Sequence, residues 1–329
     1  MKNKYDFIGI GDIVTDAFIQ LKEATVEDGR ETKRICLRFG DKIPYEDVTI
    51  VPAVGNSANA SVSAIRLGLK SALYTNLGND YYGQECLEQL KKEGVARKFV
   101  KIHKGKTTNY HYVLLFKGER TILIKHHEYD YSLPDLGRPE WIYLSSLGEH
   151  SLPLHSALEK YLVLHSEIKL AFQPGTYQIR FGKEVLAGIY KRADLFFCNR
   201  EEARRILGTS DDNIKELIKN IAELGPKIAV ITDGIKGAYA YDGKDMWFMP
   251  MYPDPKPPLD RTGAGDAFSS AFTAALALGM DISQALSWGP INSMSVVQQI
   301  GARAGLLTRT EIEKYLAQAP ADYKPQLLY

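Results

Sequence analysis

The sequence predicts an α/β fold in which helices cover both faces of a mostly parallel β-sheet. Two observations lead to this prediction. Short apolar segments typical of strands alternate along the chain with longer segments of helical periodicity, and most strand-like segments end near glycine or asparagine. Such alternation is typical of parallel sheets, because parallel strands must be joined by a crossover connection. Ligands bind these folds beyond the carboxyl ends of the strands, so we expect the functional site there.

Each predicted strand of this sheet is an apolar run bounded by turn-forming residues. The strand-like runs lie at residues 5–11, 71–78, 141–148, 169–175, 194–199 and 228–234. The helical runs between them lie at residues 57–69, 83–95, 154–167, 199–208 and 213–225. No repeat or long linker interrupts the pattern, so residues 1–329 are predicted to form a single domain.

Two segments break the alternation and predict a second, smaller sheet. Residues 30–52 alternate in the manner of a strand, and residues 107–126 resemble a hairpin whose turn lies near Lys117, Gly118 and Glu119. Together they predict a β-sheet that stands off the main body as a lid, formed by about residues 14–52 and 107–126. The alternative is a pair of edge hairpins packed on the core.

The predicted lid has an apolar face without an obvious partner. Alternation places apolar side chains on one face, namely Ile35, Leu37 and Phe39 against Val113 and Leu115. A thin sheet cannot bury both faces by itself. Because the lid segments show no helical pattern that could cover this face, we expect a homodimer formed through the lid.

Composition excludes several classes of function. The net charge is +1 without a basic block, which gives no support for nucleic-acid binding. The cysteines at 36, 86 and 198 are too far apart to predict a metal site or a disulfide framework. The sequence lacks a signal peptide and an apolar run long enough to span a membrane, so a cytoplasmic location is expected.

The segment DRTGAGD at residues 260–266 is the strongest chemical signal in the chain. Its small residues allow several backbone N–H groups to point at one spot, just before an Ala-rich helix. The helix N-terminus adds about half a positive charge, so the loop suits a phosphoryl group in transfer. Asp266 would repel that group electrostatically, which makes sense if it is a general base. The alternative is an acid that merely favours the first turn of a helix.

With this loop, several motifs make the chain resemble the ribokinase-like, or PfkB, carbohydrate kinases. The resemblance covers about residues 5–315. In order, the motifs are GDIVTD at 11–16, VGNSANASVSAIRLG at 54–68, GNDYYGQECLEQLKKEGV at 78–95, NREE at 199–202, TDGIKG at 232–237 and DRTGAGDAF at 260–268. The family implies a three-layer αβα sandwich with a small β-sheet lid, and ATP-dependent phosphorylation of a primary hydroxyl of a sugar.

The resemblance also implies roles for individual residues. The implied catalytic residues are Asp266 as the base and Gly263, Ala264 and Gly265 as the anion site. The implied acceptor-binding residues are Asp16, Gly55, Asn56, Asn59 and Asp266. The implied ATP-binding residues are Asn199, Thr232, Gly234, Gly237 and Asn292. The implied metal sites are Asn199 with Glu202 for Mg²⁺, through water, and Asp260 with Thr262 for K⁺.

Several of these residues have ordinary structural alternatives. Asn199 and Asn59 could be helix caps and nothing more. Asp16 and Gly234 could be ordinary turn residues. Arg120, beside the predicted hairpin turn, is a candidate for lid contacts, although an ordinary surface arginine is the favoured alternative.

The chain departs from the family pattern on the acceptor side. Val14 stands where ribokinases carry an asparagine that contacts the sugar, and Val54 replaces a usual glycine. Arg261 replaces a frequent threonine. These departures leave the acceptor open: a nucleoside kinase of the adenosine-kinase-like branch is the main alternative, and a non-catalytic sugar or nucleotide sensor is a lesser one. The absence of a GxxxxGK[ST] motif and of a complete dinucleotide fingerprint argues against a P-loop kinase or a Rossmann dehydrogenase.

Overall fold

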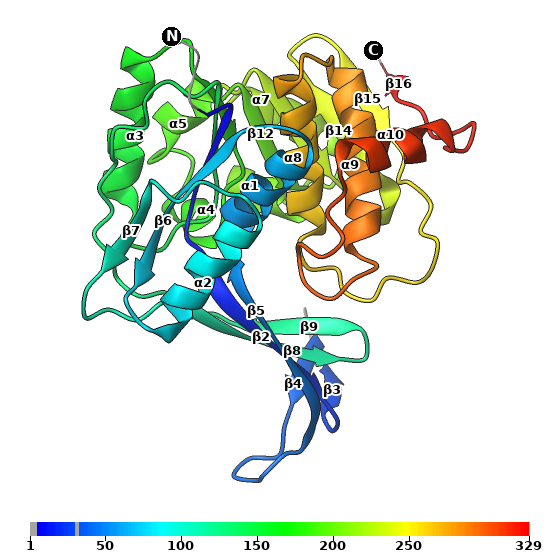
Figure 1. Cartoon of the computed structure of the whole chain (residues 1–329). Helices are drawn as coiled ribbons and strands as arrows, with labels where there is room; N and C mark the ends of the chain where they lie inside the picture. The colour runs from blue at the N-terminus through cyan, green and yellow to red at the C-terminus, as the bar shows by residue number, and fades with distance from the viewer. Residues whose placement is uncertain (1–4, 30–32, 329) are drawn as a thin grey trace.

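The computed structural model describes residues 5–29 and 33–328. A large sheet with helices on both faces forms the body, and a smaller sheet projects from it (Figure 1). In spatial order, the strands of the large sheet are β16 (Gln326–Leu327), β15 (Met246–Met249), β14 (Ala238–Tyr241), β13 (Ile228–Thr232), β12 (Leu195–Asn199), β11 (Lys169–Phe172), β10 (Trp141–Leu144), β1 (Phe7–Ile10), β6 (Ser71–Gly78) and β7 (Val100–His103). The strands from β13 to β7 pair in parallel, whereas β14, β15 and β16 are antiparallel.

The helices form the outer two layers. Those whose apolar side chains pack on one face are α3 (Leu152–Leu164), α5 (Ala187–Arg192), α6 (Arg200–Leu207) and α7 (Ile214–Ala222). Those on the other face are α1 (Asn56–Arg66), α8 (Ala264–Ala277), α9 (Ile282–Val296) and α10 (Arg309–Ala317). The remaining helices are α2 (Tyr81–Lys92), α4 (Thr176–Phe181) and the short η1 (Gly234–Lys236). Each strand and helix predicted from the apolar pattern is therefore present, with ends shifted by a few residues.

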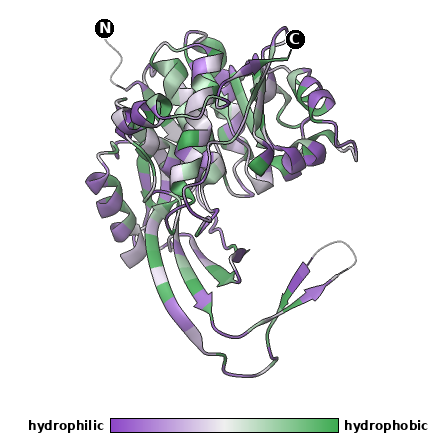
Figure 2. Ribbon diagram, turned by 90° about the vertical axis from the view of Figure 1, so that its right-hand side faces the viewer, coloured by the Kyte–Doolittle hydropathy of each residue, from purple (hydrophilic) through white to green (hydrophobic). Residues whose placement is uncertain are grey.

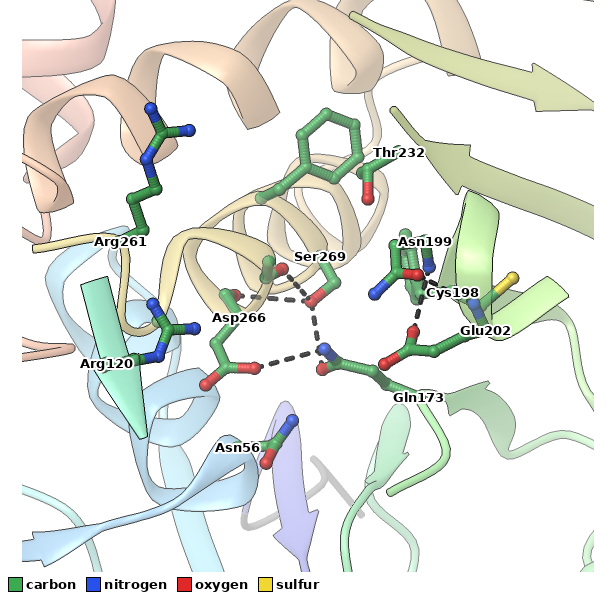
Figure 3. Close-up of a pocket in the computed structure, with 14 residues that line it drawn as sticks. Asn56, Arg120, Gln173, Cys198, Asn199, Glu202, Thr232, Arg261, Asp266 and Ser269 are labelled. Atoms are coloured by element: carbon green, nitrogen blue, oxygen red, sulfur yellow. Dashed lines mark hydrogen bonds between the residues drawn. The ribbon is translucent and has the colours of Figure 1, made fainter. Parts of the chain in front are cut away.

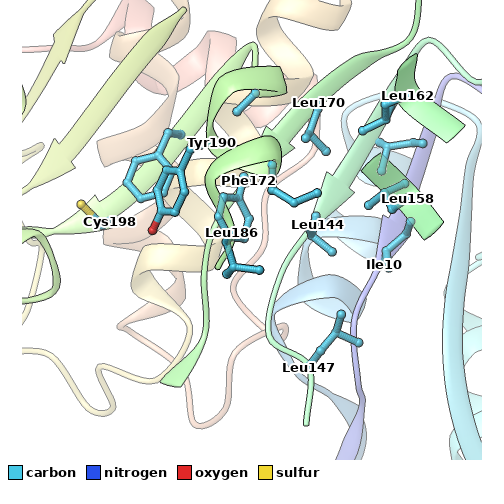
Figure 4. Packing of buried hydrophobic residues seen from close by; sticks show 14 of the residues in the cluster. Ile10, Leu144, Leu147, Leu158, Leu162, Leu170, Phe172, Leu186, Tyr190 and Cys198 are labelled. Carbon is cyan, nitrogen blue, oxygen red and sulfur yellow. The ribbon is translucent and has the colours of Figure 1, made fainter. Parts of the chain in front are cut away.

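The core follows from the two-residue period of the strands. Ile8 and Ile10 face the α3 side, where they join the cluster drawn in Figure 4, while Phe7 faces the α8 side. Both faces of the central strands are buried, which explains why the sequence shows continuous apolar runs there rather than alternation. None of the helices in the described part of the chain combines the length and the hydropathy that a membrane span requires.

The lid is a four-stranded sheet. Its order is β5 (Tyr45–Val54), β2 (Val14–Leu21), β8 (Tyr110–Phe116) and β9 (Glu119–Leu123). The predicted hairpin is confirmed, because β8 and β9 are antiparallel and turn at Lys117 and Gly118, both with positive φ. Figure 2 shows hydrophobic residues along the lid strands and a long arm beyond them.

One predicted detail of the lid is wrong. The strands β3 (Thr25–Asp28) and β4 (Lys33–Cys36) form a separate two-stranded hairpin on the arm, so Ile35 is not part of the lid sheet. Leu37 and Phe39 follow in a loop, and Phe39 is fully exposed. Val113 instead pairs with Phe18 and Ile122 and is buried. Alternation alone could not show which strand would pair with which. Residues 30–32, which belong to the same predicted segment, lie outside the described residues.

Candidate active site

Three adjoining hollows lie beyond the carboxyl ends of the central strands. The lid-side cavity, about 430 Å³, lies between the lid and the sheet. The central cavity, about 260 Å³, shares Gln173, Glu202 and Asp266 with it. The sheet-edge cleft, about 610 Å³, shares Thr232 and Gly265 with the central cavity. This is the edge of the sheet where the fold class predicts a ligand.

Asp266 lies where the lid-side and central cavities meet, and both of its oxygens are held. Asn59 Nδ2, from α1, donates to Oδ2 at 2.8 Å. Gln173 Nε2, from the end of β11, donates to Oδ1 at 3.1 Å (Figure 3). Burial raises the pKa of Asp266, and its bonds to Asn59 and Gln173 together with the charge of Arg120 oppose that rise. The carboxylate is thus fixed in direction while remaining a base stronger than an exposed aspartate.

The residues that hold Gln173 are missing from the sequence prediction. Its Oε1 accepts a hydrogen bond from the Tyr143 hydroxyl, and Ser269 Oγ lies 3.2 Å from the same oxygen. Ser269 Oγ also lies 2.6 Å from the Tyr143 hydroxyl and donates to the Gly265 carbonyl at 2.8 Å. This network connects β10, β11 and the first turns of α8. A polar residue directly after a strand was the available signal for Gln173, whereas Tyr143 lies within an apolar strand.

The anion loop, residues 260–265, leads into α8 as predicted. Gly263 is the N-cap residue with φ 80°, and a Cβ added there would lie 2.3 Å from Ala302 Cβ. Only glycine fits this position. A Cβ on Gly265 would meet just Gln173 Nε2, at 3.9 Å, so that face of the loop opens into the cavity. The Ala264 amide donates to the Arg261 carbonyl at 3.4 Å, whereas the amides of Gly265 and Asp266 have no partner within the helix and are available to an anion.

Asn199 and Glu202 lie on the wall opposite the anion loop. Asn199 Oδ1 accepts from the Glu202 amide at 2.8 Å, and Glu202 Oε2 accepts from the Asn199 amide at 2.9 Å, which is a capping box for α6. Burial raises the pKa of Glu202, and the nearby Asp266 charge adds to the rise. Glu202 also lines the central cavity, so capping and ligand binding are compatible here. The described residues contain no cluster of three metal-binding side chains.

The residues predicted to bind a nucleotide divide into two groups. Thr232, Gly234 and Gly237 line the sheet-edge cleft, whose other walls include apolar side chains of α9. Asn292 does not line it. Its amide is fully buried, donates to the Ala267 carbonyl at 2.9 Å and accepts from the Leu307 amide at 2.9 Å. Asn292 therefore joins α9 to α8, and the structure does not bring it to the cleft.

Several residues that line the lid-side cavity carry buried polar atoms without hydrogen-bond partners among the described residues. These atoms are Asp12 Oδ1, Asp16 Oδ1, Asn59 Oδ1, His111 Nε2 and His126 Nδ1. Gly55 and Asn56, also predicted, line the same cavity. His111 Nδ1 approaches Asp16 Oδ1 at 3.5 Å, and His126 Nδ1 lies 3.8 Å from Asp12 Oδ2. Buried polar atoms are rarely left unpaired, so this cavity suits a ligand rich in hydrogen-bonding groups. Neither histidine belongs to a motif, so the sequence analysis did not include them.

The remaining predicted residues lie around the anion loop. Asp260 Oδ1 accepts from the Thr262 hydroxyl at 2.6 Å, and Oδ2 accepts from the Gly301 amide at 2.9 Å. Arg120 extends from β9 and lines the central cavity together with Arg261 (Figure 3). Arg120 thus lines the cavity while remaining exposed, so it is a surface residue of the lid that also lies beside the site.

The chain is similar in sequence to known kinases over most of its length. A family model described as pfkB family carbohydrate kinase matches residues 32–309. A ribokinase of Bacillus subtilis (strain 168) is 27% identical over 287 residues, covering 85% of this chain and 92% of the relative. A cytidine kinase of Thermococcus kodakarensis is 28% identical over 254 residues, covering 75% of this chain and 88% of the relative.

The fold has close counterparts among solved structures. An Escherichia coli ribokinase-fold protein, determined in complex with ATP and Mg²⁺, superposes with a TM-score of 0.76 at 20% identity. The match covers 95% of this chain and 99% of that protein. The three-layer body and the separate small sheet are therefore those of the ribokinase fold.

Proposed function

Because the chain belongs to the pfkB family of carbohydrate kinases, we propose that it transfers the γ-phosphate of ATP to a primary hydroxyl of a sugar or sugar-containing acceptor. The observation that carries this proposal is Asp266. It lies in the first turn of α8 between two ligand-sized spaces, with its direction fixed by Asn59 and Gln173. The sheet-edge cleft would hold ATP and the lid-side cavity the acceptor.

The proposed reaction is an in-line phosphoryl transfer. Asp266 accepts the proton of the acceptor hydroxyl as that oxygen bonds to the γ-phosphorus. The bond between the γ-phosphorus and the β–γ bridging oxygen breaks, and ADP leaves. The amides at the start of α8 stabilise the charge on the transferring group, and Arg120 and Arg261 add positive charge nearby.

The proposed roles of Mg²⁺ and K⁺ rest on different grounds. Glu202 uses Oε2 for the capping bond, which leaves Oε1 to bind the waters of Mg²⁺, and Mg²⁺ retains such waters. The ion would neutralise phosphate charge. K⁺ activation rests only on the family resemblance at Asp260 and Thr262. Titration with KCl against matched choline chloride tests it, and a flat response would remove it.

The lid-side cavity favours a polyhydroxylated acceptor. Its unpaired carboxylate and amide oxygens on Asp12, Asp16 and Asn59 all need hydrogen-bond donors, which adjacent sugar hydroxyls supply. A nucleoside is the second candidate, because Val14, Ile122 and other apolar side chains also line the cavity and could pack on a base. A sensor without catalysis would have no need for a base held like Asp266.

A screen for ADP release tests the proposal directly. The purified chain is incubated with ATP, Mg²⁺ and pentoses, hexoses, their phosphates or nucleosides, and products are identified by mass spectrometry. We expect one acceptor to gain a single phosphate at a primary hydroxyl. Binding of acceptors by calorimetry without any phosphorylated product would instead favour the sensor.

We also propose that two lids join in a homodimer. Ile50, Ala17, Tyr112 and Leu123 lie side by side across the four lid strands, on the face away from Asp16. Ile50, Tyr112 and Leu123 are each about half exposed. A contiguous, half-exposed apolar row on a thin sheet favours packing against the same row of a second copy of this chain.

Light scattering tests this assembly. We expect a mass twice that of the 36.8 kDa chain and a shift to the single-chain mass for Ile50→Glu. The control Asp47→Glu changes an exposed residue of the same strand and should have no effect. A wild-type mass near 36.8 kDa would refute the dimer and would favour the nucleoside alternative.

A further inference from the structure

The segment Gly301–Arg303, after α9, touches the anion loop on one side and the lid on the other. The Gly301 amide donates to Asp260 Oδ2 at 2.9 Å. Ala302 packs so closely on Gly263 that a Cβ there would lie 2.6 Å from Ala302 Cα. These two contacts fix the start of the catalytic helix against this segment.

The next residue, Arg303, reaches in the opposite direction. Its guanidinium donates to the carbonyl oxygen of Ala53 at 3.0 Å and to that of Pro52. Both carbonyls belong to β5, the lid strand that leads back into the body. Arg303 is only 5% exposed, and no acidic side chain pairs with it among the described residues.

The two carbonyls lie at a β-bulge. Val14 pairs with Val54 and Asp16 with Val51, so Thr15 on β2 faces both Pro52 and Ala53 on β5. Ala53 has φ 58°, a conformation that favours glycine. A bulge disrupts the hydrogen-bond ladder locally, and Arg303 satisfies the carbonyls that this bulge exposes.

Burial of the Arg303 guanidinium costs desolvation free energy, so satisfying two carbonyls does not by itself account for it. Burial lowers the pKa of the Arg303 guanidinium, and a buried cation held mainly by carbonyls is a costly way to satisfy them. The bulge immediately precedes Gly55 and Asn56, and Asp16 lies opposite Val51 beside it. Its geometry therefore sets where the lid-borne carboxylate lies relative to the body.

We propose that Arg303 is a positioning residue that holds the lid at the Pro52–Ala53 bulge in register with the anion loop, so that Asp16 and Asp266 face the same acceptor. This inference rests on the proposed kinase function for its kinetic consequences. Its structural consequence, a lid anchored by one guanidinium, does not depend on that function.

Arg303→Met removes the anchor while keeping the length of the side chain. We expect the acceptor KM to rise about tenfold and the ATP KM to change little, because only the lid side of the site is disturbed. We also expect more ADP per phosphorylated acceptor, since a poorly placed lid admits water to the transferring group.

Hydrogen exchange of the unliganded protein supplies a readout that needs no activity. In Arg303→Met, amides of β2, β5 and β8 should exchange faster than in the wild type, while those of β10–β13 should not. Arg192→Met is the matched control. Arg192 also donates to several backbone carbonyls, including those of Leu162, Ser166 and Ile168, but lies away from the lid.

The outcomes separate clearly. Faster exchange confined to the lid in Arg303→Met, and absent in Arg192→Met, supports the proposal even if no acceptor is ever phosphorylated. Unchanged lid exchange, or faster exchange throughout the body, overturns it, as does an unchanged acceptor KM in an active enzyme. If Arg303→Met does not fold, Arg303→Lys provides the same test, because an ammonium group keeps the charge but cannot span both carbonyls as a guanidinium fork does.

Discussion

The body and the lid contribute very different halves to one site. On the body, both oxygens of Asp266 are bonded, and Gln173 behind it is held in turn by Tyr143 and Ser269. On the lid side, Asp16 Oδ1 and His111 Nε2 are buried without hydrogen-bond partners among the described residues. The surroundings of Asp266 are thus held by hydrogen bonds within the protein, whereas Asp16 and His111 on the lid keep polar atoms that a ligand could pair.

The difference has a physical origin. Helix α8 is packed between the sheet and its neighbours, so each polar group there must find a partner within the protein. The lid is one sheet thick, and both of its faces are partly exposed. Such a sheet is stabilised less by the burial of apolar surface, so its strands can shift when a ligand binds.

The largest expected effect comes from removing the base on the body side. Asp266→Asn should lower kcat by about 10²–10⁴, the usual contribution of a general base, without preventing ATP binding. Since burial raises the pKa of Asp266, activity of the wild type should rise as pH increases through a value above that of an ordinary aspartate. This acidic limb should be absent in the variant.

A matched acid provides the control for this prediction. Asp281→Asn alters the aspartate that caps α9, outside the described cavities, and should leave kcat unchanged. Steady-state assays over a pH series measure both variants. If Asp266→Asn retained more than half of wild-type activity, the assignment of the base would be wrong.

The two glycines of the anion loop should separate stability from activity. Gly263→Ala forces a Cβ into Ala302 at positive φ, so it should destabilise the fold by about 2–4 kcal/mol. Gly265→Ala places a methyl group in open space within a helix, so its melting temperature should hold or rise.

The activity of Gly265→Ala should nevertheless fall, by about tenfold to a hundredfold, because the methyl group occupies space that the transferring phosphoryl group needs. Thermal melts and initial rates on the same preparations check the pair. A Gly265→Ala enzyme with full activity would contradict the placement of the phosphoryl group beside α8.

The elements of the body could be predicted from the sequence better than those of the lid, because they follow from local patterns. The strands, helices and anion loop depend on local patterns, and Asp266 and Gly263 lie in one continuous motif. Gln173, Tyr143 and His126 come from separate elements, and no local pattern indicates that they converge. β3 and β4 are neighbours in the sequence and pair with each other, and alternation does not determine whether such strands pair locally or join the lid. Asn292 was misplaced for a similar reason, since a polar residue on a buried helix can serve either a ligand or the backbone.

The lid half should affect acceptor affinity rather than chemistry. Asp16→Asn should raise the acceptor KM about tenfold, the loss expected for one hydrogen bond to a charged group, with a smaller change in kcat. Asp47→Asn makes the same chemical change at an exposed position of the lid and should have no effect. A drop in kcat alone, with KM unchanged, would show that Asp16 acts in the transition state and would remove the contrast between the two halves.

The smallest expected effect concerns Glu202, whose carboxylate serves both the α6 cap and the proposed Mg²⁺ site. Glu202→Gln should raise the Mg²⁺ concentration for half activity by a few-fold, because a neutral amide attracts the hydrated ion less strongly. The wild type should need more Mg²⁺ as pH falls through the raised pKa of Glu202, since protonation removes the same charge. Glu311→Gln is the matched control, because Glu311 completes the capping box of α10 away from the cavities. Titrations of Mg²⁺ at two pH values measure both variants. Equal shifts in the two would show that the effect comes from helix capping, which would leave Glu202 as a structural part of the body rather than a ligand-binding one.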